Sequence, residues 1–241
     1  GDLHVHSTLS LDAATQGTRN RPRDAYRFAR GERLGIQPYD GDVAMREVQL
    51  ERPLDFAAVT DHAELFGELH ICRTPEAEGY DATACKIYRR WPRLAFFLIN
   101  GSMTDGSSFA FCGENAAICL KAAKGPWEET ITAAEEAYDR SSACNFTSLV
   151  AYEWTAAPET NNLHRNIIFR NGKVPELPIS SRDARKVSDL WAALDEQCNI
   201  EENGCEALII PHNSNLSGGV MFAETEEDGT PFSRDYVTRR A

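Results

Sequence analysis

The chain has 241 residues, a length that fits one large α/β domain better than two small ones. Its 37 acidic and 25 basic residues give a net charge of −12, which would repel a polyanion, so nucleic acid is disfavoured as a partner. The longest apolar run, residues 94–99, is too short to cross a bilayer, and no membrane partner is expected.

Five short segments of the chain are near-continuous apolar runs, which are typical of strands covered on both faces in a parallel sheet or barrel. In chain order they are residues 3–6, 56–60, 148–152, 166–170 and 207–210. Amphipathic spacing and helix-opening prolines predict helices over residues 22–28, 126–138 and 187–194. Because strands and helices alternate, we expect a βα layer or barrel.

The remaining segments predict turns and loops. Asn171 and Gly172 are typical of a tight hairpin turn. Residues 31–51 and 224–234 are rich in glycine and charge, so we expect loops there. A strand pattern follows Gly1 at once, which indicates that an upstream piece has been removed. Residues 1–241 are therefore expected to form a single domain that is truncated at both ends.

The cysteine spacing indicates disulfide bonds. Six of the seven cysteines fall into sequence-local pairs, namely Cys72 with Cys85, Cys112 with Cys119, and Cys198 with Cys205, and Cys144 is left over. Close pairs suit small disulfide loops in an oxidising compartment, so we expect a periplasmic or secreted protein. A zinc ribbon is the weaker alternative, because no pair has the two-residue spacing of a zinc knuckle.

The first histidines of the chain are His4 and His6, which lie two residues apart in an extended segment. Both imidazoles then point to the same face of the strand and can bind one metal ion. The alternative is a pair of solvent-facing or core histidines, because so short a pattern recurs by chance.

A second group of ionisable residues follows the strand predicted at 56–60. Asp61 and His62 come directly after it, at the carboxyl end of a strand, where barrel enzymes build their sites. The alternative for Asp61 is a helix N-cap, in which its carboxylate accepts hydrogen bonds from free backbone N–H groups.

Two later strands also deliver ionisable residues. Glu153 ends the strand predicted at 148–152, His212 follows the strand at 207–210, and His164 lies between them. A surface ion pair is the alternative for Glu153, and a satisfied core imidazole is the alternative for each histidine. Because the same pattern occurs at four places in the chain, a shared metal site is favoured over coincidence.

Several of these strings resemble the motifs of the PHP (polymerase and histidinol phosphatase) superfamily. They are Gly-Asp-Leu-His-Val-His-Ser at the start, Ala-Val-Thr-Asp-His at 58–62, Tyr-Glu at 152–153 and Ile-Pro-His at 210–212. The longer strings at 152–155, 162–166 and 211–215 resemble a large, mostly exported bacterial branch of that superfamily. The resemblance covers nearly the whole chain.

The resemblance implies a distorted (β/α)7 TIM-like barrel with two or three divalent metal ions at its carboxyl-end face. It assigns His4 and His6 to the first ion, Glu153 as a bridge to the second, His164 and His212 to the second, Asp12 and His62 to a third, and Asp2 and Asp61 to orienting the imidazoles. The superfamily's last motif, Asp-x-His, has no match before Ala241, so the carboxyl-terminal part of the barrel is expected to be missing.

These residues predict a metal-dependent hydrolase, with a metal-bridging hydroxide attacking a small phosphate ester. Imidazole and carboxylate ligands suit zinc, manganese or iron. Beside Glu153 we expect two further catalytic residues: Arg165, clamping a phosphate or forming a salt bridge instead, and Asp61 as proton donor. The alternatives are hydrolysis of a carboxylic ester or amide, a secreted metal-binding module without activity, and a fragment that is inactive until joined to its missing part.

Overall fold

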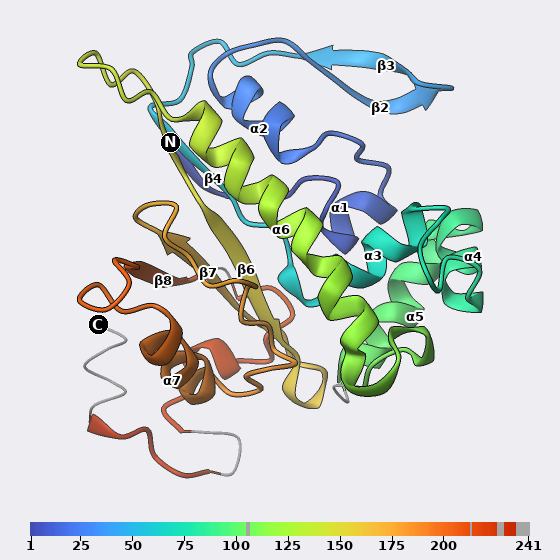
Figure 1. The fold of residues 1–241 in the computed structure, drawn as a ribbon, viewed down its shortest axis with the longest axis vertical. Helices are drawn as coiled ribbons and strands as arrows, with labels where there is room; N and C mark the ends of the chain where they lie inside the picture. Colours follow the sequence, from blue (N-terminus) through green and yellow to red (C-terminus); the bar gives the residue numbers. More distant parts are fainter. Residues whose placement is uncertain (105–106, 213, 226–228, 235–241) are drawn as a thin grey trace.

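The computed structural model describes residues 1–104, 107–212, 214–225 and 229–234 (Figure 1). The strands are β1 (Asp2–Val5), β2 (Leu34–Asp40), β3 (Val43–Val48), β4 (Phe56–Val59), β5 (Thr147–Leu149), β6 (Ala151–Ala156), β7 (Leu163–Phe169) and β8 (Ala207–Pro211). The helices are α1 (Leu11–Thr15), α2 (Pro22–Ala29), α3 (Phe66–Arg73), α4 (Thr83–Arg90), α5 (Pro92–Thr104), α6 (Ala117–Ala137) and α7 (Val187–Gln197).

The strands form three separate sheets. One is parallel, in the order β1-β4-β5, one is the β2-β3 hairpin, and one is antiparallel, in the order β6-β7-β8. No closed barrel is present in the part of the chain that the structure describes, so the expected (β/α)7 TIM-like barrel is wrong. Only residues 157–162 join β6 to β7, and a connection this short cannot make the helical crossover of a parallel pair.

The predicted strands are found near their expected positions, with two changes that affect the site. The run at 148–152 divides at Val150 into β5, which pairs with β4, and β6, which pairs with β7. Glu153 therefore lies inside β6 and not at a strand end. Strand β7 also begins earlier than expected, so that His164 lies inside it.

Two loop and turn predictions are wrong. Most of residues 31–51 forms the β2-β3 hairpin. Its residues are too polar to show the apolar runs from which strands were predicted. Asn171 and Gly172 do not join two adjacent strands, because α7 lies between β7 and β8 in the chain. Of residues 224–234, expected to be a loop, the described part contains one bridge, between Thr225 and Pro231, and residues 226–228 lie outside the described residues.

Helices α2 and α7 confirm the predictions at 22–28 and 187–194, but the predicted start of α6 at Pro126 is wrong. That helix begins at Ala117 and contains Pro126 in its interior. The proline removes one helical hydrogen bond, and buried packing on both sides of it compensates. Cys119 precedes it and Trp127 follows it on the buried face. Figure 1 shows α6 as the long helix that runs diagonally across the view.

The two faces of the β6-β7-β8 sheet have different neighbours. On one face, Tyr152, Trp154 and Phe169 belong to the main hydrophobic core, which also contains residues of α6 and α7. On the other face, Ala151 and Ile168 pack with Ala58 of β4 in a smaller apolar cluster between the two larger sheets. Since side chains alternate along a strand, the polar residues in register with this second cluster also point toward the parallel sheet.

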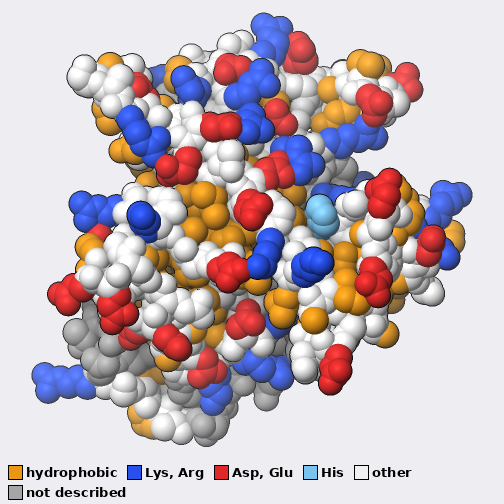
Figure 2. All heavy atoms as spheres, in the orientation of Figure 1, with side chains coloured by type: hydrophobic (Ala, Val, Ile, Leu, Met, Phe, Trp, Pro, Cys, Tyr) orange, Lys and Arg blue, Asp and Glu red, His pale blue; other side chains and the backbone are white. Residues whose placement is uncertain are grey.

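Charged side chains of both signs are interspersed on the face shown in Figure 2. Two of the ion pairs connect the region of α2 to α6: Arg21 pairs with Glu129, and the Nη2 atom of Arg23 lies 2.6 Å from a carboxylate oxygen of Glu136. Exposed pairs of this kind contribute little to stability. The packing of α2 on α6 therefore depends mainly on the apolar core beneath them.

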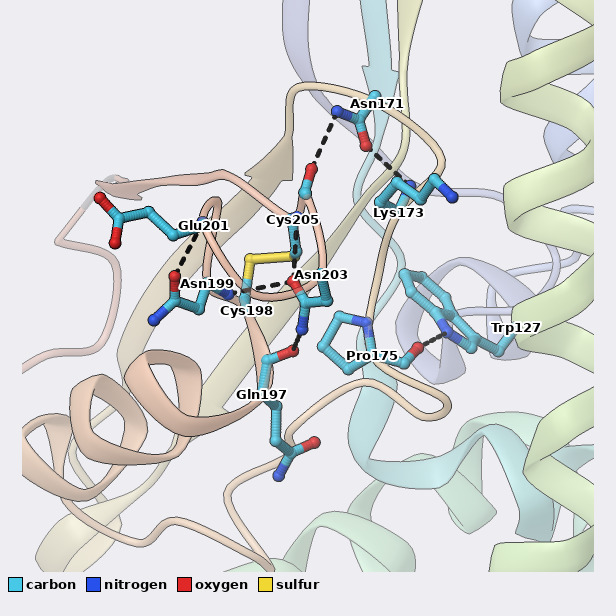
Figure 3. The surroundings of a disulfide bond; sticks show 11 residues. Trp127, Asn171, Lys173, Pro175, Gln197, Cys198, Asn199, Glu201, Asn203 and Cys205 are labelled. Carbon is cyan, nitrogen blue, oxygen red and sulfur yellow. Dashed lines mark hydrogen bonds between the residues drawn. A yellow bond between two sulfur atoms is a disulfide. The ribbon is translucent and has the colours of Figure 1, made fainter.

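All three expected cysteine pairs are disulfide bonds, and Cys144 is an exposed free cysteine. The bonds join Cys72 to Cys85, Cys112 to Cys119, and Cys198 to Cys205. The last is drawn in Figure 3, where Asn203 accepts a hydrogen bond from the Cys205 N–H and donates one to the carbonyl of Gln197. In the described residues, no helix has the length and hydropathy needed to cross a membrane.

Removing the Cys198–Cys205 bond by the double substitution to serine is expected to lower the free energy of unfolding by about 2.5 kcal/mol. The bond closes a loop with a sequence separation of 7, and its loss frees that loop in the unfolded chain. Denaturant unfolding measures the change. Cys144→Ser is the control and should stay within about 0.5 kcal/mol of the parent protein, because this side chain is exposed and unbonded.

Candidate metal centre

Glu153 lies at the meeting point of the two larger sheets. Its residue is 0% exposed. Its backbone N–H donates to the carbonyl oxygen of Asp61 at 3.0 Å, and a parallel bridge links it to His62. The segment that follows β4 is thereby tied to the middle of β6, and the end of the parallel sheet meets the antiparallel one.

Imidazole nitrogens face both oxygens of the Glu153 carboxylate. Its Oε2 atom lies 2.8 Å from Nε2 of His6 and 3.2 Å from Nε2 of His4. Its Oε1 atom lies 2.6 Å from Nδ1 of His164 and 2.6 Å from Nε2 of His212. Four rings from three strands or strand ends thus converge on one buried carboxylate.

Strand alternation and register explain this convergence. His4 and His6 are two residues apart in and just after β1, so they share a face. In the β6-β7 pair, Thr155 is opposite His164, and its Oγ1 atom lies 2.9 Å from the ring Nδ1. His212 follows Pro211, the residue of β8 that is opposite Arg165, and so reaches the same face as His164.

The donor atoms form two groups that share Glu153. One contains His4, Glu153 and His212, and the other contains His6, His62 and Glu153; within each group the candidate ligand atoms lie within 4.8 Å of one another. The resemblance had paired His4 with His6 and His164 with His212. The shared position of Glu153 is the same in both schemes, and it is the position that a bridging carboxylate would occupy.

Asp12 orients the ring of His6. Its Oδ2 atom lies 2.9 Å from Nδ1 of His6, and its Oδ1 atom accepts a hydrogen bond from the Ser10 hydroxyl at 2.5 Å. Although burial acts in the other direction, the contacts with His6 hold the pKa of Asp12 well below its usual range. An ionised carboxylate only accepts, so Nδ1 of His6 carries the hydrogen and Nε2 is directed toward Glu153.

His62 is held by two residues that the sequence did not single out. Its Nδ1 atom lies 2.9 Å from Oγ1 of Thr155, and the Thr155 N–H donates to Oε1 of Glu64 at 2.8 Å. Burial lowers the pKa of His62 to about 4 and raises the pKa of Glu64 to about 8. Glu64 comes two residues after His62, a spacing that could have indicated it.

Asp61 and Asp2 have structural contacts with the backbone near the site. Asp61 accepts hydrogen bonds from the N–H of Ser7 at 2.5 Å and from its hydroxyl at 2.6 Å, which fixes the turn after β1. Burial raises the pKa of Asp61 to about 6. Asp2 accepts a hydrogen bond from the N–H of His4 at 3.0 Å. A role for Asp61 as proton donor stays a prediction.

Arg165 and His70 are not brought to the cluster. Arg165 is buried, and strand alternation directs it to the face of β7 opposite His164. His70 is exposed and lies on α3.

The electrostatics of the cluster favour a cation at its centre. Burial opposes ionisation of Glu153, but the surrounding rings of His62, His164 and His212 hold its pKa far below the usual range. Burial also opposes charge on His6, but contacts with Asp12 and Glu153 raise its pKa to about 10. The proton on Nε2 of His6 therefore occupies the position between this ring and the Glu153 carboxylate. A divalent cation bound to both residues would occupy that same position. Imidazoles and a buried carboxylate are a donor set that suits zinc, manganese or iron.

Metal binding by this cluster is expected to release protons and to strengthen as pH rises from 5 to 8. The raised pKa of His6 means that the ring is protonated throughout this range when no cation is bound, so a cation must displace that proton. The apparent affinity should rise about tenfold per pH unit for each proton displaced. Calorimetric titration with zinc in buffers of different ionisation enthalpy measures the release, and binding without any proton release would contradict this expectation.

The fold and the site together define an α/β protein with a histidine-rich candidate metal centre built around one buried glutamate. The chain belongs to the family described as "Protein of unknown function (DUF3604)", whose model matches residues 1–241. The search of curated proteins and the search of solved structures each gave no match.

Proposed function

We propose that this protein is a metal-dependent hydrolase that acts on phosphate esters through a centre of two divalent metal ions. The observation that carries the proposal is the position of Glu153, which belongs to both donor groups. His4 and His212 would hold one ion, and His6 and His62 the other. A carboxylate with imidazoles beside both of its oxygens could bridge two ions about 3.5–4 Å apart, the spacing of two-metal hydrolytic sites.

Bound divalent ions would supply the positive charge that activates a water molecule and stabilises charge on an attacked phosphoryl group. The residues of the chain keep the ligands in position for this. Asp12 fixes the tautomer of His6, and Thr155 contacts the rings of both His62 and His164. Burial of Glu153 strengthens its interaction with any cation beside it.

The choice of phosphate esters rests on the resemblance of four motifs to the PHP superfamily. These strings contain His4, His6, His62, Glu153 and His212, all of which lie in the cluster. We therefore propose that the natural substrate is a small phosphorylated molecule and not a nucleic acid. The net charge of −12 agrees with this choice.

We also propose that the protein works in the periplasm or outside the cell. Three disulfide bonds within one chain support an oxidising compartment. Peptide mapping without reductant of protein taken from its native cells is the test. Free thiols at all seven cysteine positions would contradict the proposal.

The proposed activity is tested by reconstituting purified protein with zinc, manganese or iron(II) after chelation. Each form is assayed on chromogenic phosphate monoesters and diesters, carboxylic esters and anilides. We expect metal-dependent release from the phosphate esters. Turnover confined to carboxylic esters or anilides would contradict the substrate class, and tightly bound metal without turnover on any substrate would favour a metal-binding module.

A further inference from the structure

A cavity of about 550 Å³ lies directly beside the candidate metal centre. His4 and His6 of the β1 region form part of its wall. Strand β1 is at the edge of its sheet, since it pairs with β4 alone among the described strands. The cavity therefore begins at the metal ligands and extends past the outer edge of the parallel sheet.

The rest of the wall is largely apolar. Helix α2 contributes Ala25 and Phe28, β2 contributes Leu34 and Ile36, and the segment before β4 contributes Leu54. The volume is within the range of small-molecule sites, roughly 300–1,000 Å³, and apolar walls with few polar groups are typical of such sites.

The exposure of the ligands indicates that the cluster is open on this side. The side chain of His4 is 36% exposed, whereas those of His164 and His212 are 6% and 8% exposed. A molecule that reaches the cluster past His4 would place its remaining atoms against the wall formed by α2 and β2.

We infer that this cavity binds an apolar alkyl or aryl group of the substrate while the ester group lies at the metal centre. The inference rests on the proposed function and narrows it to esters with an apolar group. An occupant of another kind, such as a peptide strand added to the free edge of β1, would not make turnover depend on the apolar part of the ester.

The test uses metal-loaded protein and a series of alkyl phosphates from methyl to hexyl, with phosphate release as the readout. In the parent protein, kcat/KM should rise about fourfold for each added methylene group, because each one leaves water for an apolar wall. Ala25→Phe fills the cavity from α2. It should remove most of this dependence on chain length.

The matched control is Ala193→Phe, which places the same side chain on α7, in the wall of a different cavity that contains none of the candidate metal ligands. It should keep the full dependence on chain length. Leu34→Trp serves as a second cavity-filling variant if Ala25→Phe does not fold, as judged by thermal unfolding and metal content. Equal dependence on chain length in the parent and the cavity-filled variants would overturn the inference, as would the same loss in the control.

Binding of hexylphosphonate and methylphosphonate, which cannot be hydrolysed, separates this inference from the proposed function. We expect calorimetry to give tighter binding of hexylphosphonate, with the preference lost in Ala25→Phe. That result in a protein without turnover would refute the hydrolase and still support the cavity. Equal affinity for the two phosphonates would refute the role of the cavity.

Discussion

Replacing Glu153 with alanine is expected to abolish both metal binding and hydrolysis. This carboxylate is the one group that both candidate donor groups share, and its two oxygens face four imidazole rings. Its loss leaves neutral rings with no anionic bridge between the ions. Metal affinity should fall on the order of a thousandfold, which corresponds to about 4 kcal/mol. Metal analysis after dialysis and assays on the active ester measure the two losses.

Two further variants separate charge from folding. Glu153→Gln keeps the shape and one acceptor oxygen but has no charge, and we expect it to lose metal as well. Glu128→Ala, at an exposed position on α6, should keep both metal and activity. Unchanged metal content in a folded Glu153→Ala protein would show that Glu153 is not a ligand.

Replacing Arg182 with alanine is expected to destabilise the fold by about 3–5 kcal/mol, because it leaves the Glu68 carboxylate buried without its partner. Glu68 lies on α3 and its side chain is 5% exposed, and Arg182 donates a hydrogen bond to it. Burial raises the pKa of Glu68, while the Arg182 guanidinium counteracts that rise. Denaturant unfolding at two pH values measures the effect.

The sign of the pH dependence follows from the direction of this pKa shift. Without Arg182, the pKa of Glu68 should rise further in the folded protein, so that folding favours the protonated acid. Stability is then retained at low pH and lost as pH rises through the folded pKa. The variant should therefore lose more stability at pH 8 than at pH 5. The double variant Glu68→Gln with Arg182→Met should be more stable than Arg182→Ala alone at pH 8. A cost below about 1 kcal/mol, equal at both pH values, would contradict the account.

The sequence predicted local features more successfully than sheet architecture. Apolar runs located β1, β4 and β8 to within a residue or two, because burial on both faces requires such runs. A run of this kind contains no information on strand direction. The short connection between β6 and β7 requires them to pair antiparallel. The barrel prediction was wrong because it assumed parallel strands here.

Residues of the site were predictable where a motif places them in the chain and not where tertiary packing does. His4 and His6 follow from alternation along one strand, and Glu153 from its place after an apolar run. Thr155 contacts two of the histidine rings only because β6 pairs with β7 in one register. Arg165 was expected near the ligands from its position beside His164, but alternation along β7 turns it to the opposite face.

The most direct test is to locate divalent ions in crystals of the zinc- or manganese-loaded protein by anomalous scattering. We predict two peaks per chain, both beside the Glu153 carboxylate, with His4 and His212 at one and His6 and His62 at the other. Crystals of fully loaded protein without a peak beside Glu153, or with a single ion held elsewhere, would contradict the account.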